Sequence, residues 1–232
     1  MSTHTRRTKI IATLGPATGA PGLLQRILEE GVDVVRLNLS HGKADDHRER
    51  ARLVREAAAA LGREVAILAD LQGPKIRIEK FAAGRVQLAP GEAFVLDCRA
   101  DAPPGDAGRV GVSYLGLPGD VKPGDTLLLD DGLIALAVTD VVGTEVRTEV
   151  LAGGTLSDRK GLNRLGGGLT VAALSDKDRA DIRLAAEIGA DFLAVSFAKS
   201  AADMDDARRL LRAAAGQGAL VAKIERAEAI EV

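Results

Sequence analysis

Short runs of alternating apolar and polar residues lie near both ends of the chain. In the run 34–40, Arg36, Asn38 and Ser40 share one face of an extended chain, and the apolar residues between them share the other. Such alternation predicts a strand with one packed face and one face free for chemistry. Four more apolar runs of strand length lie at 9–14, 65–70, 192–197 and 220–226.

Segments with helical periodicity separate these strands. Glycines follow two of the segments, at Gly31 and Gly62, as expected where a helix ends. Ser175 and Asp178 form a capping box at the start of a third segment. The helices are expected at 21–30, 45–61, 175–187 and 201–215. Alternating strands and helices predict an α/β fold, a partial TIM (β/α)8 barrel in which polar residues at the carboxyl ends of the strands converge.

The middle of the chain has a different composition, rich in glycine, proline and aspartate with short β-branched runs. Antiparallel strands are expected at 94–96, 126–129, 134–142 and 144–151. We therefore predict an inserted small antiparallel β-barrel lid domain at 76–169, between barrel segments at 1–75 and 170–232. The triple glycine at 166–168 is either a hinge or an ordinary loop.

The run 220–226 contains the most informative pair of residues, Lys223 and Glu225. In a strand this spacing places both charges on one face, with Leu220, Ala222 and Ile224 directed into packing. An ammonium group beside a carboxylate that can bind a metal suggests phosphate or enolate chemistry.

Composition excludes several classes of function. The chain has 31 basic and 33 acidic residues and only 2% aromatic residues, so neither a nucleic-acid partner nor a membrane partner is expected. The single cysteine, Cys98, fits a buried thiol in a reducing, cytoplasmic compartment. The only Gly-Lys pair is followed by Ala44, so an ordinary P-loop kinase is excluded.

Six segments, in order along nearly the whole chain, carry a family resemblance. They are RTKIIATLGP at 7–16, VRLNLSHG at 35–42, LADLQGPKIR at 68–77, LDDGLI at 129–134, SDKDRADI at 175–182 and VAKIER at 221–226. On these segments the chain resembles the N-terminal part of pyruvate kinase. The resemblance implies phosphoryl transfer from phosphoenolpyruvate to ADP, giving pyruvate and ATP in glycolysis.

The resemblance also implies roles for individual residues. Lys223 would support the moving phosphoryl group and the enolate, Arg36 and Arg77 would bind phosphate, and Glu225 would bind Mg2+ or Mn2+. Lys177 and Ser196 match family positions on the substrate side of the site. Pro16, Asn38 and His41 match family positions on the nucleotide side. For the full-length enzyme the resemblance implies a homotetramer, although the sequence itself carries no signal for the oligomeric state.

A monovalent-cation site is a further point of comparison. Family members that require potassium match this chain at Asn38, Ser40, Asp70 and the carbonyl of Leu71, but they have Glu where this chain has Lys75. A lysine at that position supplies the positive charge internally, so K+ is not expected to be required.

Several residues have structural alternatives. Arg36 and Asp70 could form an ion pair that only caps the barrel, and His41 could lie in a surface loop. Lys177 is unfavourable in the first turn of a helix unless an anionic substrate lies nearby. Asp130 and the aspartate after it form either an ordinary turn or a group that approaches a nucleotide-bound metal.

Five strands do not close an eight-stranded barrel, so we expect this chain to be an incomplete and poorly active portion of a longer enzyme. Two other functions remain open. A metal-dependent aldolase acting on pyruvate or a related oxo acid would use the same lysine and carboxylate without ADP. A non-catalytic module would bind the ligands without turnover.

Overall fold

A computed structural model describes residues 7–20 and 22–232, and the chain divides into two compact units. The first unit contains the residues up to Gly73, together with Ala173–Glu225 and Val232. The second contains Pro74–Ala172 and Arg226–Glu231. Within the described residues no helix is both long and apolar enough to cross a membrane.

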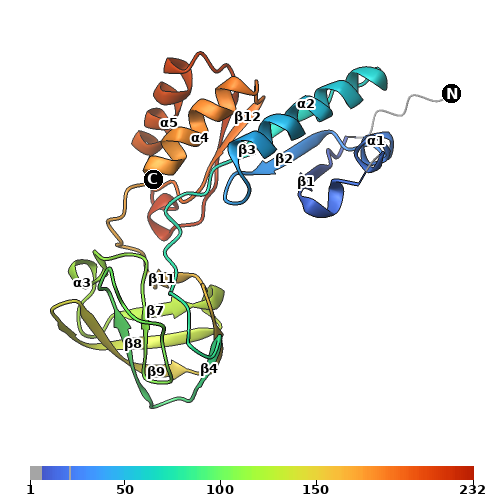
Figure 1. The fold of residues 1–232 in the computed structure, drawn as a ribbon. Helices are drawn as coiled ribbons and strands as arrows, with labels where there is room; N and C mark the ends of the chain where they lie inside the picture. The colour runs from blue at the N-terminus through green and yellow to red at the C-terminus, as the bar shows by residue number, and fades with distance from the viewer. Residues whose placement is uncertain (1–6, 21) are drawn as a thin grey trace. The chain divides into compact units, whose positions relative to one another are not determined.

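The first unit is built on a parallel sheet of five strands, which curls like half of a barrel (Figure 1). Its strands, in spatial order, are β1 (Ile11–Leu14), β2 (Val34–Asn38), β3 (Ala66–Asp70), β12 (Phe192–Val195) and β13 (Ala219–Ala222). Every neighbouring pair is parallel, so all five carboxyl ends lie at one edge. The five strands expected from the alternating runs are thus confirmed, each shorter than its run.

Helices connect these strands, and the four α-helices lie at the expected places. The segments are η1 (Pro16–Thr18), α1 (Leu23–Glu29), α2 (Ala44–Ala60), α4 (Asp176–Glu187) and α5 (Ala201–Ala213). Both expected stop glycines have positive φ, 102° at Gly31 and 60° at Gly62. The Ser175 hydroxyl accepts from the Asp178 N–H, which confirms the capping box. Pro21, the expected first residue of α1, lies outside the described residues.

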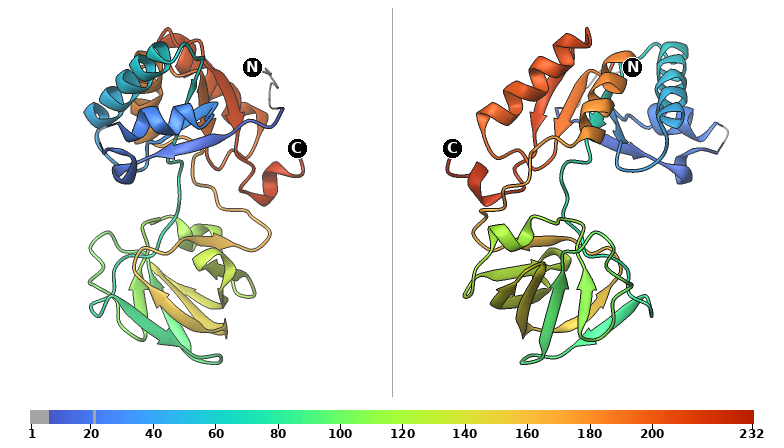
Figure 2. Two further views of the ribbon diagram at one scale, coloured as in Figure 1. Left: turned by 90° about the vertical axis from the view of Figure 1, so that its right-hand side faces the viewer. Right: turned by 60° about the vertical axis from the view of Figure 1, so that its left-hand side comes forward.

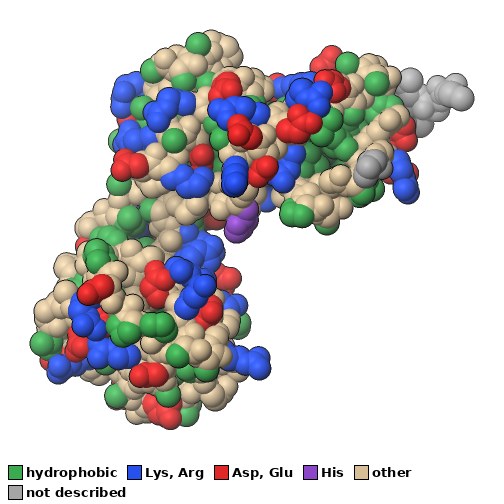
Figure 3. Space-filling model, in the orientation of Figure 1, with side chains coloured by type: hydrophobic (Ala, Val, Ile, Leu, Met, Phe, Trp, Pro, Cys, Tyr) green, Lys and Arg blue, Asp and Glu red, His purple; other side chains and the backbone are tan. Residues whose placement is uncertain are grey.

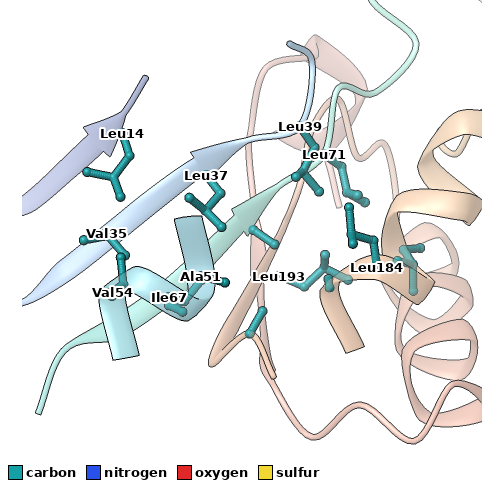
Figure 4. Packing of buried hydrophobic residues seen from close by; sticks show 14 of the residues in the cluster. Leu14, Val35, Leu37, Leu39, Ala51, Val54, Ile67, Leu71, Leu184 and Leu193 are labelled. Carbon is teal, nitrogen blue, oxygen red and sulfur yellow. The ribbon is translucent and has the colours of Figure 1, made fainter. Parts of the chain in front are cut away.

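The core of the first unit explains the alternation in β2. Val35 and Leu37 are fully buried, and they pack with Ile67 of β3 against Ala51 and Val54 of α2 (Figure 4). The polar residues of β2 therefore lie on the other face of the sheet, away from this helix layer. The exposed faces of the helices carry mixed basic and acidic side chains (Figure 3).

The second unit is almost entirely β structure, and its strands can be followed from green to yellow in Figure 2. Its elements are β4 (Arg85–Leu88), β5 (Ala93–Asp97), β6 (Arg109–Gly111), α3 (Leu117–Asp120), β7 (Thr126–Leu129), η2 (Asp130–Gly132), β8 (Ile134–Val142), β9 (Glu145–Ala152), β10 (Gly154–Ser157) and β11 (Leu162–Arg164). A six-stranded sheet has the order β11-β7-β8-β9-β5-β6, and β10 pairs with β4. All pairs are antiparallel except β5 with β6.

Residues Arg226–Glu231, which include η3 (Ala227–Ala229), pack within the second unit rather than the first. The Arg226 guanidinium donates to the carbonyl of Leu169 (2.9 Å), and a Glu228 carboxylate oxygen accepts from the Gly168 N–H (2.6 Å). The three glycines 166–168 all have positive φ, between 79° and 88°. They form a loop that is hydrogen-bonded on one side to this segment.

Candidate active site

Asp70 is the centre of the polar cluster at the carboxyl edge of the sheet. It is the last residue of β3, and its side chain is only 4% exposed. One carboxylate oxygen, Oδ2, accepts from Arg36 Nε at 2.7 Å and from Arg36 Nη2 at 2.6 Å. The other oxygen, Oδ1, lies 3.3 Å from Lys223 Nζ. A single buried carboxylate therefore holds two cations, which satisfies the requirement that a buried charge be paired.

Ser196 fixes the position of the Lys223 amine. It follows β12 directly and is 1% exposed. Its hydroxyl donates to the carbonyl of Leu71 (2.7 Å) and accepts from Lys223 Nζ (2.7 Å). Because a hydroxyl has one hydrogen, the bond to Leu71 turns the oxygen lone pairs toward the lysine.

The loop after β3 can approach Ser196 this closely only because residue 73 is glycine. Gly73 has φ +66°, and a Cβ placed there would lie 2.8 Å from the Ser196 Cβ and 2.9 Å from the Phe197 ring. The Gly73 N–H donates to an Asp178 carboxylate oxygen (3.0 Å) at the start of α4. Strand β3, strand β12 and helix α4 therefore meet at this glycine.

The expected placement of Lys223 and Glu225 within a strand is wrong. The ladder between β12 and β13 ends at Val195 and Ala222, so both charged residues follow the strand. Leu220 packs on the core as expected, but Ala222 is exposed and Ile224 is 59% exposed. Beyond the ladder, side chains no longer alternate between a packed and a free face.

Glu225 nevertheless lies beside Lys223. Its Oε1 is 3.5 Å from Lys223 Nζ, and its Oε2 accepts from the Phe197 N–H (3.1 Å). No group of three or more His, Cys, Asp or Glu side chains suited to a metal ion occurs within residues 7–20 and 22–232. A single carboxylate still fits Mg2+, which is commonly bound by one or two carboxylates, substrate phosphates and several waters.

The residues expected on the nucleotide side come from two places, the end of β2 with the turn after it, and the segment after β1. Asn38 pairs in register with Asp70, and its side-chain oxygen accepts from the Ser40 N–H (3.1 Å). His41 is exposed, and Pro16 opens the short helix η1 after β1. The structure thus brings Asn38 and Ser40 to the same sheet edge as Asp70.

Lys177 has two partners within the protein. Its ammonium donates to Asp181 Oδ2 (2.5 Å), one turn along α4, and to the carbonyl of Leu39 (2.7 Å). These contacts offset the unfavourable position of a cation in the first helical turn. An anionic substrate is therefore not needed to explain this lysine.

Two expected site residues belong to the second unit. Arg77 donates from Nη1 to the carbonyl of Arg159 (2.8 Å), and the Lys75 side chain lies beside Gly161. Asp130, one of the two turn aspartates, pairs with Lys160 at 2.8 Å. Both turn aspartates have positive φ.

Sequence reasoning missed three residues that support the cluster. Thr13 accepts from Arg36 Nη1 (3.0 Å), Asp178 binds Gly73, and His47 binds the turn after β2. Thr13 lies beside Arg36 in the β1–β2 register, so the strand pattern carried a signal for it. The hydrogen bond between Asp178 and Gly73 depends on tertiary packing, so the sequence carried no signal for it.

Comparison with known proteins places this geometry in a family. The model of the pyruvate kinase barrel domain matches residues 5–232. The chain is 54% identical over 230 residues to pyruvate kinase II of Salmonella typhimurium and 51% identical over 230 residues to a pyruvate kinase of Haemophilus influenzae. In both cases the match covers 99% of this chain and 48% of the relative.

A pyruvate kinase of Corynebacterium glutamicum is 43% identical over 225 residues, covering 97% of this chain and 47% of the relative. The chain thus spans about half the length of the curated relatives it matches. The family match extends over both units, and it includes the strand ends that carry Arg36, Asp70, Ser196 and Lys223. On this evidence the chain belongs to the pyruvate kinase family.

Proposed function

We propose that this chain provides the phosphoryl-transfer site of a pyruvate kinase, which converts phosphoenolpyruvate and ADP to pyruvate and ATP. The observation that carries the proposal is the pair of cations, Arg36 and Lys223, held on the two oxygens of Asp70 at the carboxyl edge of a parallel sheet. Phosphoryl transfer depends on fixed positive charge around the moving group, and this edge supplies it.

Each residue of the cluster has a distinct task in this mechanism. Lys223 presents its ammonium to the transferring phosphoryl group and the enolate oxygen, while Ser196 and Asp70 hold the amine in place. Arg36 offers a planar fork that suits bidentate contact with phosphate, and we assign the same task to Arg77. Glu225 would hold Mg2+ or Mn2+, which supplies charge neutralisation at the phosphoryl oxygens when bound.

The remaining assignments follow the family pattern. We propose Pro16, Asn38 and His41 for the nucleotide side, and Lys177 for the substrate side. Lys75 replaces the potassium ion that other members bind with residues matching Asn38, Ser40, Asp70 and Leu71, so activity is independent of K+.

The larger-scale assignments are part of the same proposal. Residues 76–169 form a small β-barrel lid inserted between barrel segments 1–75 and 170–232. The whole protein is a cytoplasmic homotetramer.

Phosphorus NMR of the native protein that carries these residues tests the proposal. With phosphoenolpyruvate, ADP and Mg2+, ATP should appear as fast as phosphoenolpyruvate disappears, in buffer without potassium. Lys223→Ala should lower kcat about 10²–10³-fold, as removal of a comparable electrostatic donor does. Lys80→Ala, a change at an exposed lysine outside the cluster, is the matched control.

Other results would count against all or part of the proposal. Loss of phosphoenolpyruvate without ATP formation, or a reaction that ignores ADP, would favour an aldolase-type barrel. Binding of both ligands without turnover would favour a non-catalytic module. A requirement for added potassium would overturn the assignment of Lys75 alone.

A further inference from the structure

The turn that follows β2 is held in place through its backbone. The Leu39 N–H donates to the carbonyl of Asp70 (3.0 Å), and the His41 N–H donates to the carbonyl of Asn38 (3.4 Å). The Ser40 N–H is bound by the Asn38 side chain. These bonds fix the N–H groups of three consecutive residues, and they leave the carbonyl groups to partners from elsewhere in the fold.

Side chains from two helices bind those carbonyl groups. Lys177 of α4 donates to Leu39, and His47 of α2 lies with its Nε2 atom 2.9 Å from the carbonyl oxygen of His41. His47 is the fourth residue of α2, and its ring folds back over the start of the helix to reach a residue six positions earlier. The turn is therefore tied to both flanking helices.

The contact of His47 determines which ring nitrogen carries hydrogen. A carbonyl oxygen only accepts, so Nε2 must be the protonated nitrogen. His47 is 3% exposed, and its other nitrogen, Nδ1, has no hydrogen-bond partner in the described part of the chain. A proton added at Nδ1 would be buried without an acceptor, which is unfavourable.

The charged groups around the ring act in opposite directions. Burial, the largest effect, lowers the pKa of His47, and the charge of Arg50 on the same helix lowers it further. The hydrogen bond to His41 raises it, as do the charges of Asp181 on α4 and Asp46 on α2. The net pKa lies below the ordinary value, so the ring is neutral at neutral pH.

The turn also lies next to this ring. Gly42 has φ +85°, and a Cβ placed there would lie 3.5 Å from His47 Nε2 and 3.6 Å from Arg50 Nη1. The Lys43 N–H donates to the Asp46 side chain (2.8 Å) just before α2 begins. Movement of the turn would therefore disturb the Lys43–Asp46 hydrogen bond as well as the contact with His47.

We propose that His47, in its neutral form with hydrogen on Nε2, is a positioning residue that holds the turn 39–42 in the shape that receives the nucleotide. The inference rests on the proposed function, which assigns Asn38 and His41 to the nucleotide side. His47 itself touches neither substrate. It acts through the carbonyl of His41, and its loss should impair ADP more than phosphoenolpyruvate.

Two substitutions separate positioning from simple folding. His47→Gln keeps a donor near the place of Nε2, whereas His47→Ala removes it. Arg52→Ala, at a surface arginine of the same helix, controls for general effects on α2. In the native protein, His47→Ala should raise the dissociation constant and the KM for ADP about 3–10-fold, the value of one lost hydrogen bond. The glutamine variant should stay within about 2-fold of wild type, and the KM for phosphoenolpyruvate should not change.

Nitrogen NMR of the imidazole rings gives a readout independent of activity. The chain has only three histidines, so the signal missing in His47→Gln identifies residue 47. We expect hydrogen on Nε2 and a bare Nδ1 at neutral pH. A signal showing hydrogen on Nδ1 would overturn the inference whatever the kinetics show.

The kinetic results can also overturn it. Equal losses for ADP and phosphoenolpyruvate, equal losses in both variants, or no loss in His47→Ala would each contradict a positioning role. Wild-type protein that shows the expected tautomer but binds no ADP would refute the proposed function, and with it the nucleotide part of this inference.

Discussion

Replacing Asp70 by asparagine removes the charge that Arg36 and Lys223 share. Two guanidinium nitrogens lie 2.6 and 2.7 Å from one oxygen, whereas the lysine amine lies 3.3 Å from the other. Hydrogen bonds to charged groups contribute about 1.5–3 kcal/mol, and both cations are about one-third exposed, so solvent replaces part of the loss. We expect Asp70→Asn to lower the free energy of unfolding of the first unit by about 2–3 kcal/mol.

A double-mutant cycle apportions this loss between the two cations. Asp70→Asn combined with Arg36→Met should give a coupling energy of about 2 kcal/mol, and combined with Lys223→Met about 1 kcal/mol or less, because the lysine contact is longer. The control is the exposed pair Arg52–Glu56, whose contact is shorter but whose coupling energy should be smaller, because water screens exposed charges.

Urea unfolding followed by helical circular dichroism reports on the first unit, because α1, α2, α4 and α5 all lie there. The second unit has only the four-residue α3 and the three-residue 3₁₀ helices η2 and η3. A coupling between Asp70 and Arg36 no larger than that of the exposed pair would refute the reasoning. The burial of Asp70 would then not make its ion pair any stronger than a pair at the surface.

Four further results are expected. Gly73→Ala should cost about 2–4 kcal/mol of unfolding free energy because the new Cβ overlaps its neighbours, whereas Gly62→Ala, also at positive φ but in open space, should cost about 1 kcal/mol; equal costs would contradict the close approach. Ser196→Ala should lower kcat about 10-fold or more with little change in KM, and an unchanged kcat would show that the site lysine needs no hydroxyl support. Folding lowers the pKa of His47, so protonation of this ring should reduce the free energy of unfolding as the pH falls from about 6.5 toward the folded-state pKa, with no such loss above about pH 6.5. Urea unfolding measured over this pH range should show the decrease in wild type and not in His47→Gln. Burial raises the pKa of Cys98 to about 12, so a thiol reagent should label it only after unfolding, and rapid labelling of folded protein would contradict its buried position.

The alternation of apolar and polar residues predicted the strands in which buried and exposed side chains alternate along the chain. The bounds of β7 and β8 agree with those expected at 126–129 and 134–142, and the face assignment of β2 is confirmed by the burial of Val35 and Leu37. The strands β4, β6, β10 and β11 were missed. Each has only one or two apolar residues, so no apolar run marks it, whereas the equally short β7 has three consecutive leucines.

The candidate site was predictable in part for a similar reason. Polar residues at the ends of parallel strands must meet at one edge, so Asp70, Ser196 and Lys223 could be grouped once a barrel was expected. The individual hydrogen bonds among these residues could not be predicted, because they depend on which strands are neighbours in the sheet. Asp181 lies four residues after Lys177, so the sequence carried a signal for this pair. The second partner of Lys177 and the partner of His47 are backbone carbonyl groups, which no side-chain pattern in a sequence identifies.

The segment 226–231 has a consequence for dissecting the protein genetically. Because the second unit includes residues on both sides of Ala173–Glu225, deleting 74–172 would not excise it cleanly. Arg226, whose side chain is 9% exposed, would lose the carbonyl of Leu169, and Glu228 would lose the amide of Gly168. The two side chains would keep their own ion pair (3.8 Å), but the segment would lose the surface on which it packs. An engineered minimal first unit should therefore omit 226–231 as well as bridge the gap.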